Sequence, residues 1–276
     1  MKKILALLLA LSMVFVLGAC KDNGSDYEYI KEKGEMIIGI TLFKPMNYYN
    51  EKNDLVGFET EFAEAVCAKL GVKADFQEIN WAAKETELNG KTIDCIWNGM
   101  TIDEDRLANM SISTPYMQNK QVLVVKAENA GLTSVDGLKI AAEGGSAGAN
   151  VIENDAYFKN AQFIEVEDMA AALMEVAAGT SDGCVIDYVT SLGSIGEGTD
   201  YANLVVVEAA KFELGNDEQY GIAFRKGSDM TEKVNAAITE LVEDGTLAKI
   251  AAAYGLEDQL IEEDIESNLK TISAIF

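Results

Sequence analysis

Three stretches of the sequence combine residue types that could bind a charged small molecule. Asn98-Gly99-Met100-Thr101 follows an apolar run and precedes Arg106, whose planar guanidinium can form two parallel hydrogen bonds with a carboxylate. Gly144-Gly145-Ser146-Ala147 begins a helical pattern, where free backbone N–H groups favour an anion and the serine is the expected N-cap. Asp187 ends another apolar run and can pair with a cation. Together these stretches could bind the carboxylate and the ammonium of a zwitterion.

Each stretch also has a purely structural interpretation. Arg106 can pair with the acidic turn before it, the glycine-rich turn can do no more than begin a helix, and Asp187 can be solvated in a loop. The glycine-rich turn matches neither G-x-G-x-x-G nor G-x-x-x-x-G-K-[ST], which disfavours a nucleotide site. Phe43 and Trp81 flank loops that follow predicted strands, where an aromatic ring can contact a ligand or belong to the core.

The composition excludes several classes of function. The 276 residues contain 22 Lys and Arg against 46 Asp and Glu, a net charge of −24, which disfavours nucleic-acid binding. The chain has no His, which excludes Ser-His-Asp and Cys-His nucleophile systems and any His-ligated zinc or haem. Cys67, Cys95 and Cys184 form no CxxC pair and are expected to be small buried hydrophobic residues. We predict no catalytic residue, no metal and no cofactor.

The first twenty residues are typical of an export signal with a lipid attachment site. Two lysines precede an apolar run at 4–17, which is followed by Gly18-Ala19-Cys20. We predict a signal peptide at 1–19, a lipid on the Cys20 sulfur and a flexible tether at 20–26. An ordinary signal peptide and a transmembrane anchor are the alternatives.

Strand-like and helix-like segments alternate along the rest of the chain. Strands are expected at 36–41, 72–79, 92–98, 121–126, 138–142, 162–166, 182–187, 204–208 and 220–225. Helices are expected at 58–70, 146–158, 168–178 and 230–242, with a last one around 247–254. This alternation predicts an α/β fold with a largely parallel sheet.

A weak internal repeat indicates two similar lobes. Residues 89–98 and 178–187 both run from a helix end through a Gly turn into a strand, and the strands end in Asn98 and Asp187. Because ligands bind beyond the carboxyl ends of strands in open α/β sheets, we expect the two polar ends to face one cleft.

Several motifs, in this order and spacing, resemble those of the polar amino-acid class of extracellular solute-binding proteins, family 3, which serve ABC importers. They are Gly57-Phe58-Glu59 with Ala63, Ile93 to Arg106 followed by Ser113-Thr114-Pro115-Tyr116, Glu143-Gly144-Gly145-Ser146, Gly183 to Asp187, and Tyr220 to Gly227. The resemblance covers residues 34–256. It implies a periplasmic-binding-protein type 2 fold, with two lobes that each contain a mostly parallel sheet flanked by helices, joined by two crossover strands. Lobe 1 would comprise 27–119 plus 220–276, and lobe 2 would comprise 120–219.

The resemblance also implies a set of ligand-binding residues. The α-carboxylate would be contacted by Arg106, by Thr101 and by the backbone N–H groups of Ser146 and Ala147. The α-ammonium would be contacted by Asp187, by Thr101 and by the Gly99 carbonyl. The ligand side chain would pack on Phe43 and Trp81, and Asn98 and Gln118 would face it. Ala147 replaces a hydroxyl residue, and Asn98 replaces a smaller one. The ligand side chain therefore stays open between cystine, glutamine and another polar residue.

The function implied is capture of an L-amino acid between two closing lobes, for delivery to an ABC permease in the membrane. The protein would be a monomer anchored by lipid to the outer face of the cytoplasmic membrane, or to the periplasmic side in a Gram-negative cell. An enzyme on the same scaffold, such as a small-acid dehydratase, would need a general acid or base, and Glu85, Glu143 and Glu218 are conceivable. A sensor domain would need a transmembrane helix after the domain, and 256–276 is too polar for one.

Overall fold

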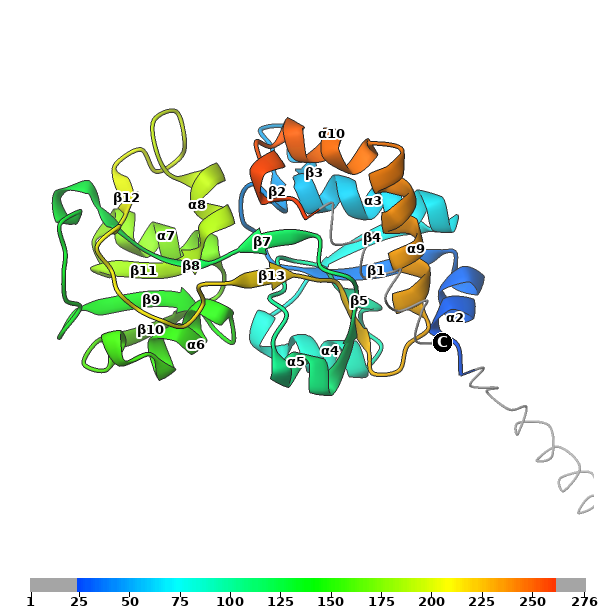
Figure 1. The fold of residues 1–276 in the computed structure, drawn as a ribbon, viewed down its shortest axis with the longest axis horizontal. Helices are drawn as coiled ribbons and strands as arrows, with labels where there is room; N and C mark the ends of the chain where they lie inside the picture. The colour runs from blue at the N-terminus through cyan, green and yellow to red at the C-terminus, as the bar shows by residue number, and fades with distance from the viewer. Residues whose placement is uncertain (1–23, 262–276) are drawn as a thin grey trace, which may run out of the picture.

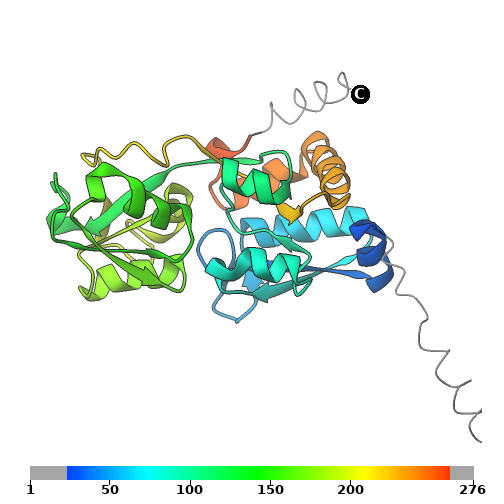
Figure 2. The ribbon, with the colours of Figure 1, turned by 90° about the horizontal axis from the view of Figure 1, so that it is seen from below.

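A computed structural model describes residues 24–261, so the predicted signal peptide, Cys20 and most of the predicted tether lie outside the described residues. The described chain forms two lobes, each built around one five-stranded sheet (Figure 1). Helices flank both sheets, which confirms the predicted two-lobed α/β fold. Seen after a quarter turn, the lobes lie side by side and the chain segments that connect them run along one side of the molecule (Figure 2).

The sheet of lobe 1 has the strand order β4-β1-β5-β14-β6. Its strands are β1 (Glu35–Ile40), β4 (Lys73–Glu78), β5 (Cys95–Ile96), β6 (Met110–Ile112) and β14 (Ala223–Arg225). Strand β1 pairs in parallel with β4 and β5, whereas β14 pairs antiparallel with β5 and β6.

The sheet of lobe 2 repeats this plan with the order β10-β9-β11-β8-β12. Its strands are β8 (Gln121–Lys126), β9 (Lys139–Glu143), β10 (Gln162–Val166), β11 (Gly183–Asp187) and β12 (Leu204–Val206). Strand β9 pairs in parallel with β10 and β11, and β8 pairs antiparallel with β11 and β12. The strands of the predicted internal repeat, β5 and β11, thus hold the same middle position.

Both sheets are mixed, but in each of them four of the five strands run in the same direction, which confirms the expectation of mostly parallel sheets; only β14 and β8 run the other way. Strands β8 and β14 follow the two connections between the lobes, β7 (Met117–Asn119) and β13 (Glu218–Tyr220), which pair antiparallel with each other. A strand that enters a lobe from its neighbour begins at the cleft and runs away from it. It must therefore lie antiparallel to β5 or β11, whose carboxyl ends meet the cleft. The predicted strand at 220–225 is divided in the structure, because β13 connects the lobes and β14 belongs to the sheet of lobe 1.

Nine α-helices and four short 3-10 turns connect the strands within residues 24–261. Around lobe 1 lie α2 (Asp26–Lys33), α3 (Phe58–Leu70), α4 (Lys84–Asn89), α5 (Glu104–Asn109), α9 (Met230–Glu243), α10 (Thr246–Ala253), η1 (Trp81–Ala83) and η4 (Glu257–Gln259), with a hairpin of β2 (Tyr48–Tyr49) and β3 (Leu55–Val56). Around lobe 2 lie α6 (Ala147–Asn154), α7 (Met169–Ala178), α8 (Tyr188–Ser194), η2 (Ala127–Asn129) and η3 (Ala156–Phe158). Helices α2, α5 and α8 were not predicted, and α4 was expected only as the helix end that precedes Gly90.

Helices α6 and α7 cover opposite faces of the sheet of lobe 2. The β9 residues Ile140 and Ala142 belong to the same buried cluster as Val151 of α6, whereas Ala141 belongs to the cluster that contains Leu173 of α7. Successive residues of a strand point to opposite faces, so a strand covered on both faces reads as a continuous apolar run. This is why β8, with its continuous apolar run, begins and ends at the predicted residues.

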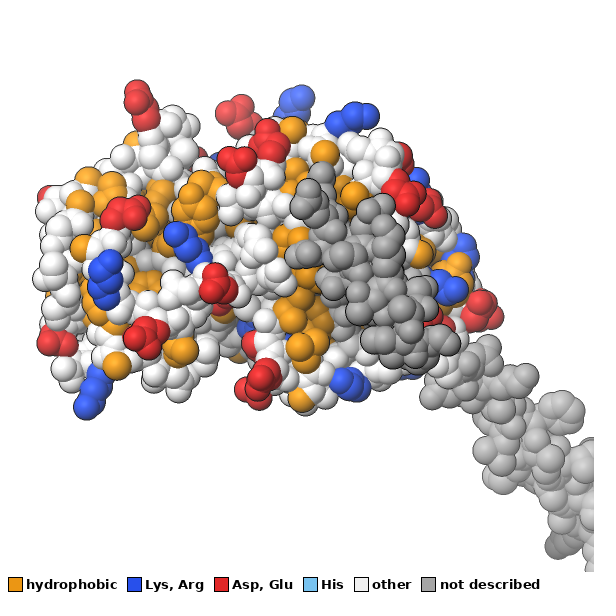
Figure 3. Space-filling view, in the orientation of Figure 1, with side chains coloured by type: hydrophobic (Ala, Val, Ile, Leu, Met, Phe, Trp, Pro, Cys, Tyr) orange, Lys and Arg blue, Asp and Glu red, His pale blue; other side chains and the backbone are white. Residues whose placement is uncertain are grey.

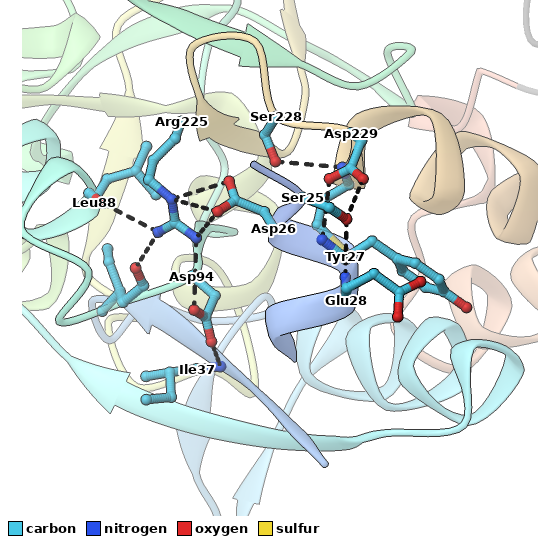
Figure 4. Close-up of polar contacts among 12 residues, drawn as sticks. Ser25, Asp26, Tyr27, Glu28, Ile37, Leu88, Asp94, Arg225, Ser228 and Asp229 are labelled. Atoms are coloured by element: carbon cyan, nitrogen blue, oxygen red, sulfur yellow. Dashed lines mark hydrogen bonds and ion pairs between the residues drawn. The ribbon is translucent and has the colours of Figure 1, made fainter. Parts of the chain in front are cut away.

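The predicted tether is too long, because its last residues belong to lobe 1 (Figure 4). The Asp26 carboxylate lies 3.0 Å from Nη2 of Arg225 in β14, and Nη1 of the same guanidinium donates to the Leu88 and Ile93 carbonyls. Ser25 caps α2 by accepting from Glu28 N, and its hydroxyl donates to Asp229. Helix α2 is thus bound by a partly buried ion pair and by one buried residue, Ile30, rather than by an apolar stripe, which explains why periodicity did not predict it.

Cys67, Cys95 and Cys184 are buried free thiols, as predicted. Burial raises the pKa of the Cys67 thiol to about 12, so this thiol stays protonated. Within residues 24–261 no helix is both long and apolar enough to span a bilayer, and no group of three His, Cys, Asp or Glu side chains is arranged for a metal ion. On the face shown in Figure 3, acidic and basic side chains are scattered over both lobes.

Candidate functional site

The facing surfaces of the two lobes touch at several points. Lys84 Nζ, from lobe 1, donates to the Gly145 carbonyl of lobe 2 at 3.0 Å, and Lys44 Nζ lies 2.6 Å from Asp200 Oδ2. A Cβ atom placed on Gly193 of α8 would lie 2.8 Å from Pro45 of lobe 1. The structure is therefore closed, and the side chains between the lobes are shielded from water.

Arg106 is buried at this cleft, with 8% of its surface exposed. It lies in the first turn of α5, where Asp103 is the N-cap and accepts from Arg106 N at 2.7 Å. Its Nη1 donates to the Thr101 carbonyl at 2.7 Å, and its Nε lies 3.2 Å from Asp103 Oδ2. Arg106 thus pairs with the acidic turn, as the structural interpretation expected, yet is buried rather than at the surface.

Gly99 brings backbone against two aromatic rings. Its φ of +54° lies in the left-handed region, and a Cβ there would lie 3.0 Å from Phe43 Cζ and 3.3 Å from Tyr220 Cζ. Its N–H donates to Glu59 Oε1 at 2.8 Å, and the nearby Thr101 hydroxyl donates to Glu218 Oε2 at 3.2 Å. The two predicted residues therefore occupy one tightly packed turn beside Phe43.

Asp187 ends β11 and is 2% exposed. Its carboxylate accepts hydrogen bonds from the Tyr220 hydroxyl, at 2.7 Å, and from Gln121 Nε2. Burial raises the pKa of Asp187, and these hydrogen bonds together with the positive charge of Arg106 oppose that rise. The positive charge of Arg106 in lobe 1 therefore acts on the Asp187 carboxylate in lobe 2, as the zwitterion hypothesis requires.

The glycine-rich turn begins α6 as predicted. Ser146 is the N-cap, and its Oγ accepts from Ala149 N at 3.0 Å. The N–H groups of Ala147 and Gly148 are in the first turn, so the helix offers them no acceptor. A Cβ on Gly148 would lie 2.9 Å from the Val185 carbonyl of β11. The start of α6 is thus packed closely against the strand that carries Asp187.

Phe43 and Trp81 are both buried; Phe43 belongs to a hydrophobic cluster with residues from both lobes, and Trp81 belongs to a cluster of lobe 1. Lys84 Nζ lies 4.9 Å from the Trp81 ring centroid, which is a cation–π contact. The sequence left open whether these rings belong to the core or line a ligand site. In the structure both rings are buried in the core and lie at the border of the cleft.

Two sequence-based assignments do not agree with the structure. Asn98 does not face the cleft with its amide, because Oδ1 accepts from the Thr41 N–H and hydroxyl and Nδ2 donates to the Thr41 carbonyl. Gln118 is exposed, whereas Asn119 and Gln121 are buried beside Glu218 and Asp187. Successive residues of β7 alternate in direction, so Gln118 points to solvent whereas its neighbours Met117 and Asn119 are buried.

Sequence reasoning missed how many acids lie buried around the cleft. Glu59 accepts from Gly99, Tyr116 and Asn47, and burial raises its pKa to about 7. Glu218 accepts from Asn119, Gln121 and Thr101, and burial together with the Asp187 charge raises its pKa to about 7.

Lys84 and Glu143 form a further pair of buried charges. Burial lowers the pKa of Lys84 to about 8, with the Arg106 charge acting in the same direction. Burial raises the pKa of Glu143 to about 8, and the Asp187 charge contributes to that rise. The sequence had offered Glu143, which ends an apolar strand, only as a conceivable general acid or base of an enzyme. Lys84 has no signal in the sequence, because its burial depends on lobe 2.

Comparison with known proteins places the chain among solute-binding proteins. Residues 36–257 match the sequence profile of the bacterial extracellular solute-binding proteins, family 3. The arginine-binding extracellular protein ArtP of Bacillus subtilis is 29% identical, covering 91% of this chain and 96% of ArtP. The L-cystine-binding protein TcyA of the same organism is 30% identical, covering 94% and 99%. An ABC uptake transporter substrate-binding protein from Streptococcus pneumoniae, with bound histidine, superposes with a TM-score of 0.72 at 28% identity, covering 84% and 96%.

Proposed function

Because the chain belongs to the bacterial extracellular solute-binding proteins of family 3, we propose that it binds the head group of an L-amino acid between its lobes. Arg106 and the first-turn N–H groups of α6 bind the α-carboxylate, because a guanidinium and a helix N-terminus both favour an anion. Asp187 binds the α-ammonium, with the Gly99 carbonyl and the Thr101 hydroxyl as further acceptors.

One observation carries the proposal: a buried Arg106 and a buried Asp187 lie on opposite lobes within electrostatic range. A zwitterion between them supplies each with a partner of opposite charge. The ligands in the names of the relatives, arginine, cystine and histidine, all have this head group, which supports the same assignment.

Binding and closure are coupled in this proposal. The lobes open about the two connections β7 and β13, and the ligand favours the closed form because it contacts both lobes only there. The closed monomer is then recognised by an ABC permease. The pattern Leu17-Gly18-Ala19-Cys20 supports a lipid on Cys20 that holds the protein at the outer face of the membrane.

A thermal-shift screen of the purified protein against the twenty amino acids plus cystine and ornithine tests the proposal. A ligand that binds only the native state adds about 2.7 kcal/mol of stability at a hundred times Kd. We expect a clear rise in Tm with one or a few L-amino acids and none with their D-enantiomers. No rise with any of them, in protein freed of ligand by unfolding and refolding, contradicts the proposal.

A second candidate is an enzyme on the same scaffold, favoured by the buried Glu143 and Glu218 with pKa values of about 8 and about 7. A carboxylic acid that stays protonated near pH 7 can act as a general acid. Mass spectrometry of the ligand after long incubation separates the two candidates. An unchanged mass supports binding alone, and loss of water or another group supports the enzyme.

A further inference from the structure

A lysine and a glutamate from opposite lobes come together at the cleft, in addition to Arg106 and Asp187: Lys84 Nζ donates to the carbonyl of Gly145, two residues after Glu143. Lys84, from α4 of lobe 1, is 6% exposed, and Glu143, from the end of β9 in lobe 2, is 2% exposed. Each affects the pKa of the other: the Glu143 charge raises that of Lys84, and the Lys84 charge lowers that of Glu143. In both pairs the cation belongs to lobe 1 and the anion to lobe 2.

Lys84 retains one donor for a ligand. Its Nζ donates to the Gly145 carbonyl at 3.0 Å and to the Trp81 carbonyl at 3.3 Å. An ammonium has three N–H donors, so one remains. These two carbonyls hold the ammonium at the cleft, between the Trp81 ring and the start of α6.

Glu143 retains an acceptor. Its Oε1 is buried and has no hydrogen-bond partner within residues 24–261. Glu143 ends β9 in lobe 2, and the Lys84 ammonium of lobe 1 donates to the carbonyl of Gly145, two residues further along the chain, so this carboxyl lies beside a contact between the lobes. A buried carboxyl oxygen without a partner costs free energy, and a donor from the ligand would remove that cost.

We propose that the ligand side chain ends in a group that both accepts a hydrogen bond from Lys84 and donates one to Glu143. A side-chain carboxamide has this chemistry, and so does a second amino-acid head group such as that of cystine. The inference rests on the proposed function, because Arg106 and Asp187 must first hold the α-groups.

Other side chains match this pair less well. A guanidinium or a side-chain ammonium satisfies Glu143 but places a cation beside Lys84 and Arg106. A side-chain carboxylate satisfies Lys84 but offers no donor to Glu143 Oε1 and adds an anion near Asp187. An apolar chain leaves both groups without a partner, which a site built for hydrogen bonding disfavours strongly.

Isothermal titration of the full-length protein with matched ligands tests the inference. L-Glutamine, L-glutamate, L-lysine and L-norleucine have side chains of similar length, and L-cystine carries the second head group. We expect glutamine or cystine to bind at least tenfold more tightly than glutamate, lysine and norleucine. The identity of the tighter of these two ligands decides between the carboxamide and the second head group. A preference for lysine, arginine, glutamate or norleucine overturns the inference but leaves amino-acid capture standing. Binding of no amino acid overturns the proposed function itself.

Two variants separate the roles of the pair. We expect Lys84→Met and Glu143→Gln each to weaken the preferred ligand by at least tenfold and to reduce its advantage over norleucine. Lys73→Met on β4 and Glu153→Gln on α6 are matched controls, because both residues are exposed. Unchanged selectivity in folded Lys84→Met and Glu143→Gln overturns the inference. If either variant does not fold, the ligand series with the wild-type protein decides alone.

Discussion

Glu59 should make the unliganded protein less stable as the pH rises. Its Oε1 accepts from the Gly99 N–H and the Tyr116 hydroxyl, and its Oε2 accepts from Asn47 Nδ2 at 2.9 Å. Burial raises its pKa from 4.5 to about 7 in spite of these hydrogen bonds. The folded protein therefore holds this proton more tightly than the unfolded chain does. The stability that the proton provides is complete below about pH 4.5 and is lost as the pH rises through about 7.

The size of the effect follows from linkage between the two pKa values. Between pH 5 and pH 8 the unfolded chain gives up the Glu59 proton readily, whereas the folded protein gives it up at a cost. The free energy of unfolding should fall by about 2.5 kcal/mol over this range because of Glu59 alone. Glu143 and Glu218 have raised pKa values too and should add to the fall.

Glu59→Gln isolates the contribution of this one residue. The amide does not ionise, so urea unfolding at pH 5, 6, 7 and 8 should show a shallower decline than in the wild-type protein, by about 2.5 kcal/mol over the range. Glu64→Gln, on the exposed side of the same helix, is the control and should keep the wild-type slope. Parallel pH profiles for Glu59→Gln and the wild-type protein would refute the reasoning.

Three further substitutions test the packing that positions the site. Gly193→Ala places a Cβ 2.8 Å from Pro45, so titration should show amino-acid affinity reduced at least tenfold while the Tm of the unliganded protein changes little; unchanged affinity would contradict close lobe contact. Arg225→Lys loses the fork that reaches two carbonyls and a carboxylate, and urea unfolding should show a loss of about 1–3 kcal/mol. Asn98→Ala removes the three hydrogen bonds to Thr41 and should lower the free energy of unfolding by about 1–3 kcal/mol. An unchanged free energy of unfolding would show that the amide does not stabilise the fold.

The elements that could be predicted were those whose signal lies in their own residues. A continuous apolar run gave the bounds of β8, and the four-residue spacing in 58–70 followed by Gly71 gave α3 and its end. Helix α8 contains Thr, Ser and Gly residues that favour helix weakly, so its formation depends on packing after Asp187. The direction of β8 and β14 depends on the connections between lobes, which local periodicity does not encode.

The candidate site divides in the same way. Arg106, Ser146 and Asp187 could be placed at the cleft because each stands next to a strand end or a helix start, where a charged group has a defined position. The roles of Asn98 and Gln118 depend on residues distant in the chain, and the structure assigns them differently. The burial of Glu59 and Glu218 could not be predicted for the same reason, because their hydrogen-bond partners come from several distant elements.

The binding of the α-groups is the central claim, and a titration series with altered head groups tests it most directly. The preferred L-amino acid is compared with its methyl ester and with its des-amino analogue, using the wild-type protein, Arg106→Lys and Asp187→Asn, with circular dichroism as the check of folding. Loss of a buried, charged partner should cost about 2–5 kcal/mol. We predict that the wild-type protein loses at least thirtyfold in affinity for both analogues, that Arg106→Lys, which keeps the charge but not the planar guanidinium, distinguishes the ester less than the wild-type protein does, and that Asp187→Asn no longer distinguishes the des-amino compound. Equal binding of all three ligands to the wild-type protein would contradict the account.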